Sequence, residues 1–217
     1  MLSVWCADES GVTYPAPPWQ LQGELYASLW RVPARSFPAS GLSEFHPLTL
    51  FEQTLVGTAW AHYEPGGVLA YNEVLAACRV RGPDATATHI PLIWVDDPSS
   101  IAGARALWGV PKRLATFSIT STRAAFEAAA VADGQAIASI RFQPRLQLPG
   151  RWRLQTRLAH SSPDGMKITR ARLSARVTFG STEWQFASEG PLAFLAFRTP
   201  LASVRFSEMT LAFGLPR

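Results

Sequence analysis

The stretch from Ile101 to Leu114 reads IAGARALWGVPKRL, and it holds one of the two lysines in the chain. Lysine and arginine together number 20, and all but Lys112 and Lys167 are arginine. Arginine serves solubility and ion pairing as well as lysine does, but its guanidinium stays protonated and cannot act as a nucleophile. A desolvated lysine amine can lose its proton and attack a carbonyl. Two interpretations follow for Lys112: a surface residue after a turn, or a lysine that forms a Schiff base.

The residues around Lys112 predict a short helix followed by a strand. An Asp-Asp-Pro-Ser-Ser cluster precedes Ile101–Trp108, and Asp or Ser can cap a helix whose first turn accepts proline. Gly109 ends this helix, and Pro111 keeps the chain extended afterwards. Lys112 is therefore expected between a helix end and a strand that covers residues 114–121.

Most of the remaining chain alternates apolar runs with tight-turn residues such as Asp-Gly, which is typical of antiparallel strands. We expect a mainly β (β-rich α+β) domain, built as a barrel or a pair of curved sheets, with one or two short helices. The expected strands cover 25–32, the second half of 48–63, 68–80, 89–95, 114–121, 123–132, 135–144, 151–161, 167–179, 182–188 and 201–213. Residues 189–199 are expected to form a second short helix.

The length of 217 residues predicts a single domain, 1–217, with a proline-rich, irregular arm at residues 1–22. Apolar residues make up 47% of the chain and charged residues only 17%, which favours extensive burial and a homo-oligomer. No run reaches the ~20 apolar residues of a membrane helix, and the first residues do not resemble a signal peptide. Cys6 and Cys78 give no disulfide framework, so a reduced, cytoplasmic protein is expected.

The net charge of +4 is carried by dispersed arginines rather than by a basic run, so no nucleic-acid partner is expected. Two arginine sets alternate along strands, where residues i and i+2 share one face. These are Arg151, Arg153, Arg157 and Arg170, Arg172, Arg176. They are interpreted as the solvated faces of neighbouring strands, with an anion-binding patch as the alternative. The four histidines lie far apart, so neither a metal nor a cofactor is expected.

Glu73 is the one acid in the apolar segment from Val68 to Val80. A buried carboxylate must be paired, protonated or functional. An ion pair with Arg79, Arg31 or another arginine would be purely structural, whereas a pair with Lys112 would form a catalytic site.

Three segments in order resemble the acetoacetate decarboxylase superfamily. They are Tyr71-Asn72-Glu73, Trp94-Val95-Asp96, and the Gly103–Leu114 segment with its Pro-Lys-Arg-Leu end. The resemblance implies a cone-like, mostly antiparallel β-barrel whose interior holds Lys112 and Glu73. In that family the lysine forms an imine with a β-keto acid, and the imine accepts the electron pair released when CO₂ leaves.

The resemblance assigns roles to further residues. Lys112 is the nucleophile and Glu73 a proton-transfer or orienting acid. Arg113 and Arg105 would give electrostatic support, and three aromatic residues would line the cavity or simply pack in the core: Tyr71, Trp94 and Trp108. The sequence departs from the family where Arg113 replaces a second lysine and Ala106 replaces a helix acid. It also has Leu21–Glu24 where decarboxylases carry an arginine thought to meet the substrate carboxylate.

These residues predict a Schiff-base-forming lyase that acts on a β-keto acid or another small carbonyl compound. An aldolase-dehydratase using the same lysine is the alternative within this chemistry, and a non-catalytic barrel that binds a small ligand is the alternative outside it. An apolar interior is expected to lower the pKa of Lys112 by ~3–4 units, whereas a non-catalytic lysine should titrate near pH ~10.

Overall fold

The computed structural model describes residues 4–38, 44–83, 85–122 and 124–216. It is rich in strand, with a single α-helix among the described residues, which confirms the predicted fold class. The strands are β1 Trp5–Ala7, β2 Thr13–Pro15, β3 Trp19–Pro33, β4 His46–Pro47, β5 Thr49–Leu50, β6 Gln53–Tyr63, β7 Asn72–Arg81, β8 Thr86–Val95, β9 Arg113–Leu114, β10 Thr116–Ser121, β11 Phe126–Ala132, β12 Gln135–Gln147, β13 Trp152–Ser162, β14 Gly165–Phe186 and β15 Ala202–Leu215. The helices are α1 Pro98–Trp108 and the 3₁₀ turns η1 Ala34–Ser36 and η2 Ala193–Leu195.

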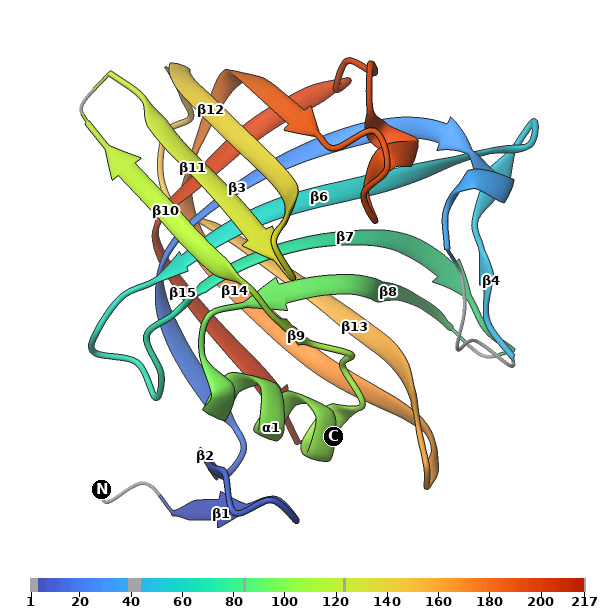
Figure 1. Cartoon of the computed structure of the whole chain (residues 1–217), viewed down its shortest axis with the longest axis vertical. Helices are drawn as coiled ribbons and strands as arrows, with labels where there is room; N and C mark the ends of the chain where they lie inside the picture. The colour runs from blue at the N-terminus through green and yellow to red at the C-terminus, as the bar shows by residue number, and fades with distance from the viewer. Residues whose placement is uncertain (1–3, 39–43, 84, 123, 217) are drawn as a thin grey trace.

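Seven strands pair in a closed ring, in the order β14, β13, β8, β7, β6, β3, β15 and back to β14. All the pairings in this ring are antiparallel except the short contact between β8 and β13, where Leu158 meets Thr88 in parallel. The ring leaves few free strand edges, which is the advantage that closed sheets have over open ones. In Figure 1, β3, β6, β7 and β8 cross in front of β13, β14 and β15.

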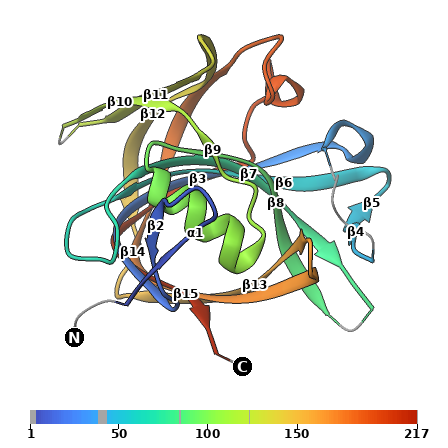
Figure 2. The same ribbon diagram turned by 60° about the horizontal axis from the view of Figure 1, so that its bottom comes forward.

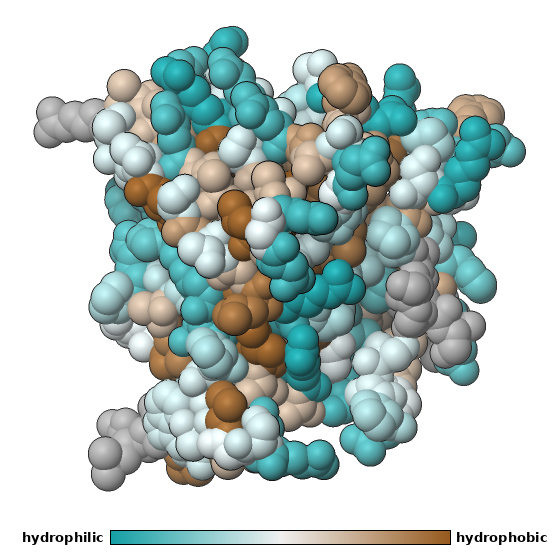
Figure 3. Space-filling model, viewed as in Figure 1, coloured by the Kyte–Doolittle hydropathy of each residue, from teal (hydrophilic) through white to brown (hydrophobic). Residues whose placement is uncertain are grey.

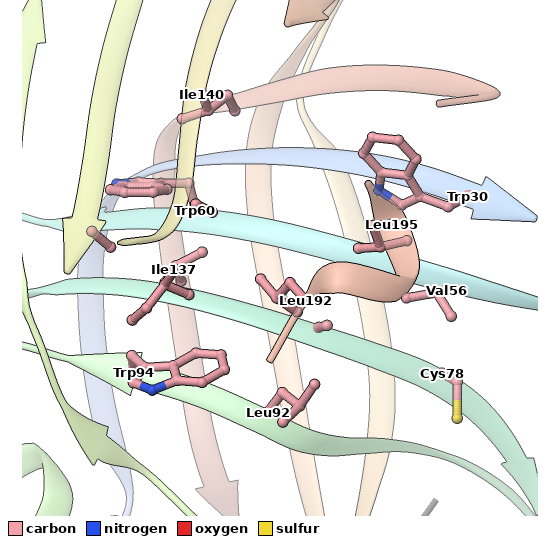
Figure 4. Packing of buried hydrophobic residues seen from close by; sticks show 14 of the residues in the cluster. Trp30, Val56, Trp60, Cys78, Leu92, Trp94, Ile137, Ile140, Leu192 and Leu195 are labelled. Atoms are coloured by element: carbon pink, nitrogen blue, oxygen red, sulfur yellow. The ribbon is translucent and has the colours of Figure 1, made fainter. Parts of the chain in front are cut away.

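The ring is extended by β12, β11 and β10, which follow from the second half of β14. These strands cover the outer face of β3, β6, β7 and β8. The cluster between them is apolar and includes Trp30, Trp60 and Trp94, together with Ile137 and Ile140 from β12 (Figure 4). The four front strands are therefore buried on both faces, which explains why their sequences read as nearly continuous apolar runs.

Helix α1 lies at one end of the ring, next to β2 and the ends of β13 and β14 (Figures 1 and 2). Asp97 caps it by accepting a hydrogen bond from the backbone N–H of Ser100, Pro98 lies in its first turn, and Gly109 ends it in the left-handed conformation with φ 68°. The helix end is as expected from the sequence, whereas the helix begins at Pro98, inside the predicted start cluster, three residues before the expected Ile101. It is the only α-helix in the described ranges, and it is neither long nor apolar enough to span a membrane.

Some expected boundaries were wrong. Residues 167–179 and 182–188 form one continuous strand, β14, rather than two strands joined by a turn at Gly180. A side chain at Gly180 would meet the Gln143 carbonyl oxygen at 2.4 Å and the Phe142 ring at 2.4 Å. The glycine therefore serves close packing against β12 and not chain reversal.

The N-terminal arm is more regular than expected, because β1 pairs with β2 and β3 already begins at Trp19. Trp19 is almost fully buried, and alternate residues from Trp19 to Gly23 turn inward, so the segment pairs as strand. The expected helix at 189–199 is reduced to the single turn η2. Met1–Ser3 and Arg123, which fall in the predicted arm and in the predicted strand 123–132, lie outside the described residues.

The surface seen in Figure 3 carries small apolar groups among hydrophilic residues. Several large apolar side chains are exposed in the described chain, among them Phe51 at 91% and Phe197 at 102%. The alternating arginines of β13 and β14 are exposed, as expected for a solvated strand face.

Candidate active site

The chain after α1 turns sharply enough to direct Lys112 back into the ring. The N–H of Val110 donates to the Ala104 carbonyl at 3.1 Å, and the N–H of Lys112 donates to the Val110 carbonyl at 2.8 Å. The second bond spans two residues around Pro111, as in a γ-turn. Residues 113–114 then pair in parallel with the end of β8. Lys112 is thus held between a capped helix end and a strand.

The arginines predicted as electrostatic support lie outside the ring. Arg105 donates from its guanidinium to the backbone carbonyl of Lys112, so it fixes the turn rather than the amine. Arg113 is exposed, and its guanidinium lies 5.8 Å from the centre of the Trp94 ring. Alternation along the chain explains this, because Lys112 points inward and its neighbour must point outward.

The amine of Lys112 is surrounded by oxygen atoms. Its Nζ lies 2.7 Å from Oε2 of Glu73, 3.0 Å from the hydroxyl of Tyr71 and 2.8 Å from Oγ of Ser100. Lys112 and Glu73 are each only 5% exposed, and Ser100 is fully buried. An ammonium group has three hydrogen-bond donors, and all three have an acceptor here.

Glu73 is placed by the start of β7, where it pairs with Ala61 of β6 and Val95 of β8. The preceding residue, Asn72, donates from its backbone and its side chain to the Asp96 carboxylate at 2.7 and 2.6 Å. This bidentate contact ties the start of β7 to the end of β8. The Glu73 carboxylate is thereby held at a fixed distance from the turn that carries Lys112.

Burial and the nearby charge shift the pKa of the Lys112 amine in opposite directions. Desolvation alone lowers the pKa of Lys112, but the Glu73 carboxylate and the Tyr71 hydroxyl raise it, and the net shift is upward from 10.5. The expectation of a lowered pKa is therefore wrong for the resting site, because a carboxylate 2.7 Å away outweighs the apolar surroundings. The resting state is a buried ammonium–carboxylate pair.

Two tyrosines complete the polar end of the site. Burial raises the pKa of Tyr71 to about 12, against the opposing effect of Lys112, so its phenol stays protonated at neutral pH. Burial also raises the pKa of Tyr63, with the Glu73 charge adding to the effect, and its hydroxyl lies 3.4 Å from Oε1 of Glu73. Both phenols can therefore donate a hydrogen bond to an oxygen bound near Lys112.

Lys112 and Glu73 line a cavity of about 240 Å³ inside the ring. Most of its wall is apolar and comes from β3, β6, β7, β8, β13, β14, β15 and α1. Trp108 lines it, as expected, together with Trp19 and Phe213. Trp94 does not, because it points to the opposite face of β8 and packs in the outer cluster of Figure 4. Among the described residues, no arginine lines this cavity.

The acetoacetate decarboxylase (ADC) family model matches residues 45–160, just over half of the chain, and this range contains Lys112, Glu73, Tyr71 and Ser100. The chain belongs to the acetoacetate decarboxylase family. A search of curated protein sequences found no match.

Several solved structures share the fold of this chain at low sequence identity. Acetoacetate decarboxylase from Legionella pneumophila subsp. pneumophila str. Philadelphia 1 is 15% identical with a TM-score of 0.68, covering 92% of this chain and 86% of that one. The enduracididine biosynthesis enzyme MppR complexed with pyruvate is 16% identical with a TM-score of 0.67, covering 100% and 98%. An acetoacetate decarboxylase-like enzyme from Sphingomonas wittichii RW1 is 15% identical with a TM-score of 0.59, covering 91% of each chain. These matches show that the chain shares the fold of these enzymes.

Two residues of the site were not foreseen from the sequence. Ser100 stands in the first turn of α1, where its serine was interpreted only as part of the helix-start cluster. Tyr63 ends β6, and only the pairing of β6 with β7 brings it beside Glu73. Within the described ranges, no group of three or more His, Cys, Asp or Glu side chains is placed to hold a metal ion.

Proposed function

We propose that this protein is a Schiff-base-forming carbon–carbon lyase in which Lys112 condenses with the carbonyl group of a small, largely apolar substrate. One observation carries the proposal: the Lys112 amine lies 2.7 Å from Glu73 in the wall of a mostly apolar cavity of about 240 Å³. A structural ion pair could stand anywhere in a core, whereas this one faces a space that a ligand can fill.

The upward pKa shift gives Glu73 a defined task. A protonated amine cannot attack, so Glu73 must first take a proton from Lys112, which the distance of 2.7 Å allows. The neutral amine adds to the substrate carbonyl, and Glu73 returns the proton to the hydroxyl that leaves as water. The product is a protonated imine beside a carboxylate, which preserves the charge balance of the resting pair.

The protonated imine then acts as an electron sink. In decarboxylation, the pair of the breaking carbon–carbon bond moves into the imine as CO₂ leaves, and the resulting enamine takes a proton on carbon. Water hydrolyses the imine and regenerates the amine. Tyr71 and Tyr63, both protonated, are placed to hydrogen-bond the substrate oxygen during addition and hydrolysis.

Aldol-dehydration is the second candidate, and it is favoured because no arginine is found among the described residues that line the cavity. A carboxylate next to the reacting carbonyl would lie near Glu73 without a cation of its own, which is unfavourable in an apolar site. In the aldol reaction, Glu73 removes a proton from the carbon next to the imine, and the enamine adds to an aldehyde. CO₂ release from acetoacetate, as against enone formation from an aldehyde and a ketone, separates the two reactions.

Imine turnover is tested by carbonyl oxygen exchange in ¹⁸O-labelled water, with acetone and 2-heptanone as substrates. Each cycle of imine formation and hydrolysis replaces the ketone oxygen. We expect exchange above the uncatalysed rate, its loss in Lys112→Met, and its retention in the matched control Lys167→Arg. Equal exchange by the wild type and Lys112→Met would overturn the proposal.

A further inference from the structure

The nitrogen of Lys112 has three N–H bonds in the resting ammonium but only one in the protonated imine. Condensation with a ketone releases one molecule of water, and both of its hydrogens come from this nitrogen. Three oxygen atoms that accept from the resting ammonium then compete for a single N–H. They are Oε2 of Glu73 at 2.7 Å, the Tyr71 hydroxyl at 3.0 Å and Oγ of Ser100 at 2.8 Å. The acceptor that keeps the N–H sets the plane of the imine.

Ser100 is the acceptor that lies away from the cavity. The other two acceptors, Glu73 and Tyr71, both line it, whereas Ser100 is not among the described residues of the cavity wall and is fully buried. Ser100 stands in the first turn of α1, where its backbone N–H donates to Oδ1 of Asp97 at 2.5 Å. The capped helix start therefore fixes the Ser100 hydroxyl behind the amine, on the side that a substrate does not occupy.

The hydrogen of the Ser100 hydroxyl is directed at Tyr71. A hydrogen bond from Ser100 opposes the rise in the pKa of Tyr71, and a bond has this effect when the serine donates to the phenol oxygen. The lone pairs of the Ser100 oxygen are thereby left for an N–H of Lys112. The phenol oxygen of Tyr71 already receives the serine hydrogen, and its lone pairs are partly delocalised into the ring. Tyr71 is therefore a weaker acceptor for the imine N–H than Ser100.

The directions of the three acceptors also favour Ser100. The N–H bonds of an ammonium are staggered about 120° apart around the Cε–Nζ bond, so the three acceptors are spread around this axis. An imine nitrogen is planar, and its single N–H and the substrate carbon lie on opposite sides of the same axis. With the N–H directed at Ser100, the substrate carbon lies between Glu73 and Tyr71, which both face the cavity. With the N–H directed at Glu73, the carbon would lie between Tyr71 and Ser100, partly outside the cavity.

The first arrangement leaves Glu73 beside one face of the imine, about 60° out of its plane. A bond made or broken at the carbon next to the imine must stand perpendicular to this plane, because its electron pair has to overlap with the π system. A carboxylate that accepts the imine N–H lies in the plane and is badly placed to move a proton at that carbon. A carboxylate beside the face is well placed.

We propose that Ser100 is a positioning residue that holds the N–H of the imine and thereby releases Glu73 to move protons at the substrate carbon. This inference rests on the proposed function and adds a residue to its machinery. Ser100 acts through Lys112 and does not contact the substrate.

The test follows two labels in acetone incubated with the protein in D₂¹⁸O and analysed by high-resolution mass spectrometry. Incorporation of ¹⁸O counts the cycles of imine formation and hydrolysis, and deuterium counts proton transfers at carbon. Ser100→Ala should lower the deuterium incorporated per ¹⁸O at least about tenfold, because the imine N–H then turns to Glu73. The matched control Ser99→Ala makes the same change in the same turn of α1 and should keep the wild-type ratio.

Ser100→Cys separates positioning from packing. The thiol fills the place of the hydroxyl but is a weak acceptor, so this variant should show the same low ratio as Ser100→Ala. A wild-type ratio in Ser100→Cys would assign Ser100 a packing role and overturn the inference. A fall of both labels in equal proportion in Ser100→Ala would also overturn it, while the oxygen exchange of the wild type kept the lyase.

A second measurement needs no substrate. A hydrogen-bond acceptor favours the ammonium form, so Ser100→Ala should lower the pKa of Lys112 and Ser99→Ala should not. The pKa is read from the ¹³Cε shift of labelled lysine in the Lys167→Arg background. An unchanged pKa in Ser100→Ala would overturn Ser100 as an acceptor for the amine. A lowered pKa without oxygen exchange in the wild type would keep that contact but overturn the lyase, and with it the imine role of Ser100.

Discussion

Lys112 and Glu73 form a buried ion pair in which proximity, rather than burial, sets the direction of the pKa shift of the amine. Burial alone disfavours the ammonium form, but the carboxylate at 2.7 Å favours it more strongly. In the proposed mechanism, proton transfer from Lys112 to Glu73 is therefore the first step.

Replacing Glu73 by Gln should reverse the direction in which the pKa of Lys112 is shifted. Without the carboxylate, desolvation becomes dominant, and the pKa of Lys112 should fall below 10.5. The measurement is the ¹³Cε shift of labelled lysine against pH, with Lys167→Arg as the background because it leaves one lysine signal. A midpoint for Glu73→Gln at or above that of the wild type would contradict this assignment.

The raised pKa of Lys112 also determines how the stability of the fold depends on pH. The folded pKa of Lys112 lies above its unfolded value, so the contribution of the pair is fully present below the unfolded pKa and is lost as pH rises through the folded pKa. The part of the stability that depends on the Lys112 charge is therefore constant at neutral pH and falls in the alkaline range above 10.5.

Lys112→Met should destabilise the fold by about 3 kcal/mol, because it leaves a buried carboxylate without its cation. Adding Glu73→Gln should restore much of this loss, since a neutral amide is easier to bury than an unpaired charge. Urea unfolding of the two single variants and the double variant measures the coupling. Strictly additive effects would mean that the two side chains do not interact.

At the level of single residues, the pair of Lys112 and Glu73 could be predicted from the sequence, but the residues around it could not. Lys112 and Glu73 stood out because each is chemically unusual in its own segment. Ser100 and Tyr63 carry no such signal, since a serine at a helix start and a tyrosine at a strand end are ordinary. The sign of the pKa shift also depends on a distance between β7 and the turn after α1, which a sequence does not contain.

The end of α1 determines the direction in which the side chain of Lys112 points. Gly109 adopts φ 68°, and a Cβ at this position would meet the Ser161 carbonyl oxygen at 2.5 Å. The helix end therefore packs directly on β13, and any displacement of this contact moves the following turn. The helix-to-strand junction predicted from Gly109 and Pro111 is thus the segment that positions Lys112.

Gly109→Ala should combine backbone strain of about 1–2 kcal/mol with a steric clash against β13. Its matched control is Gly134→Ala, because Gly134 has a similar φ of 75° but no atom within 4 Å of an added Cβ. We expect Gly109→Ala to lose more stability in urea and to lose oxygen exchange at least tenfold, whereas Gly134→Ala keeps its exchange rate. Equal losses in both variants would show that the contact with β13 does not position Lys112.

Strand β14 shows why the boundaries of a strand cannot always be predicted from the sequence. Phe-Gly-Ser at 179–181 has the chemistry of a turn, yet the strand continues because β12 lies too close for any side chain at Gly180. A glycine that permits close packing and a glycine that permits a turn look the same in a sequence. Only the partner strand distinguishes them.

At the scale of the molecule, the closed ring produces two separate interiors. One face of β3, β6, β7 and β8 packs against β11 and β12, and the other encloses the lysine cavity. Alternation along the strands decides which of their residues lie in which interior, which is why Trp94 of β8 belongs to the core. Trp108 lines the cavity from the end of α1. The strand-rich class was predictable from turn spacing, whereas the ring depends on pairings between distant segments such as β3 with β15.

The central claim is that Lys112 forms an imine with a carbonyl substrate. The most direct measurement is borohydride reduction in the presence of acetone or 2-heptanone, followed by peptide mass mapping. The account predicts a stable adduct on Lys112 that is absent from Lys112→Met and retained in Lys167→Arg. No adduct on Lys112 across these ketones, or adducts on Lys167 or the N-terminal amine alone, would contradict it.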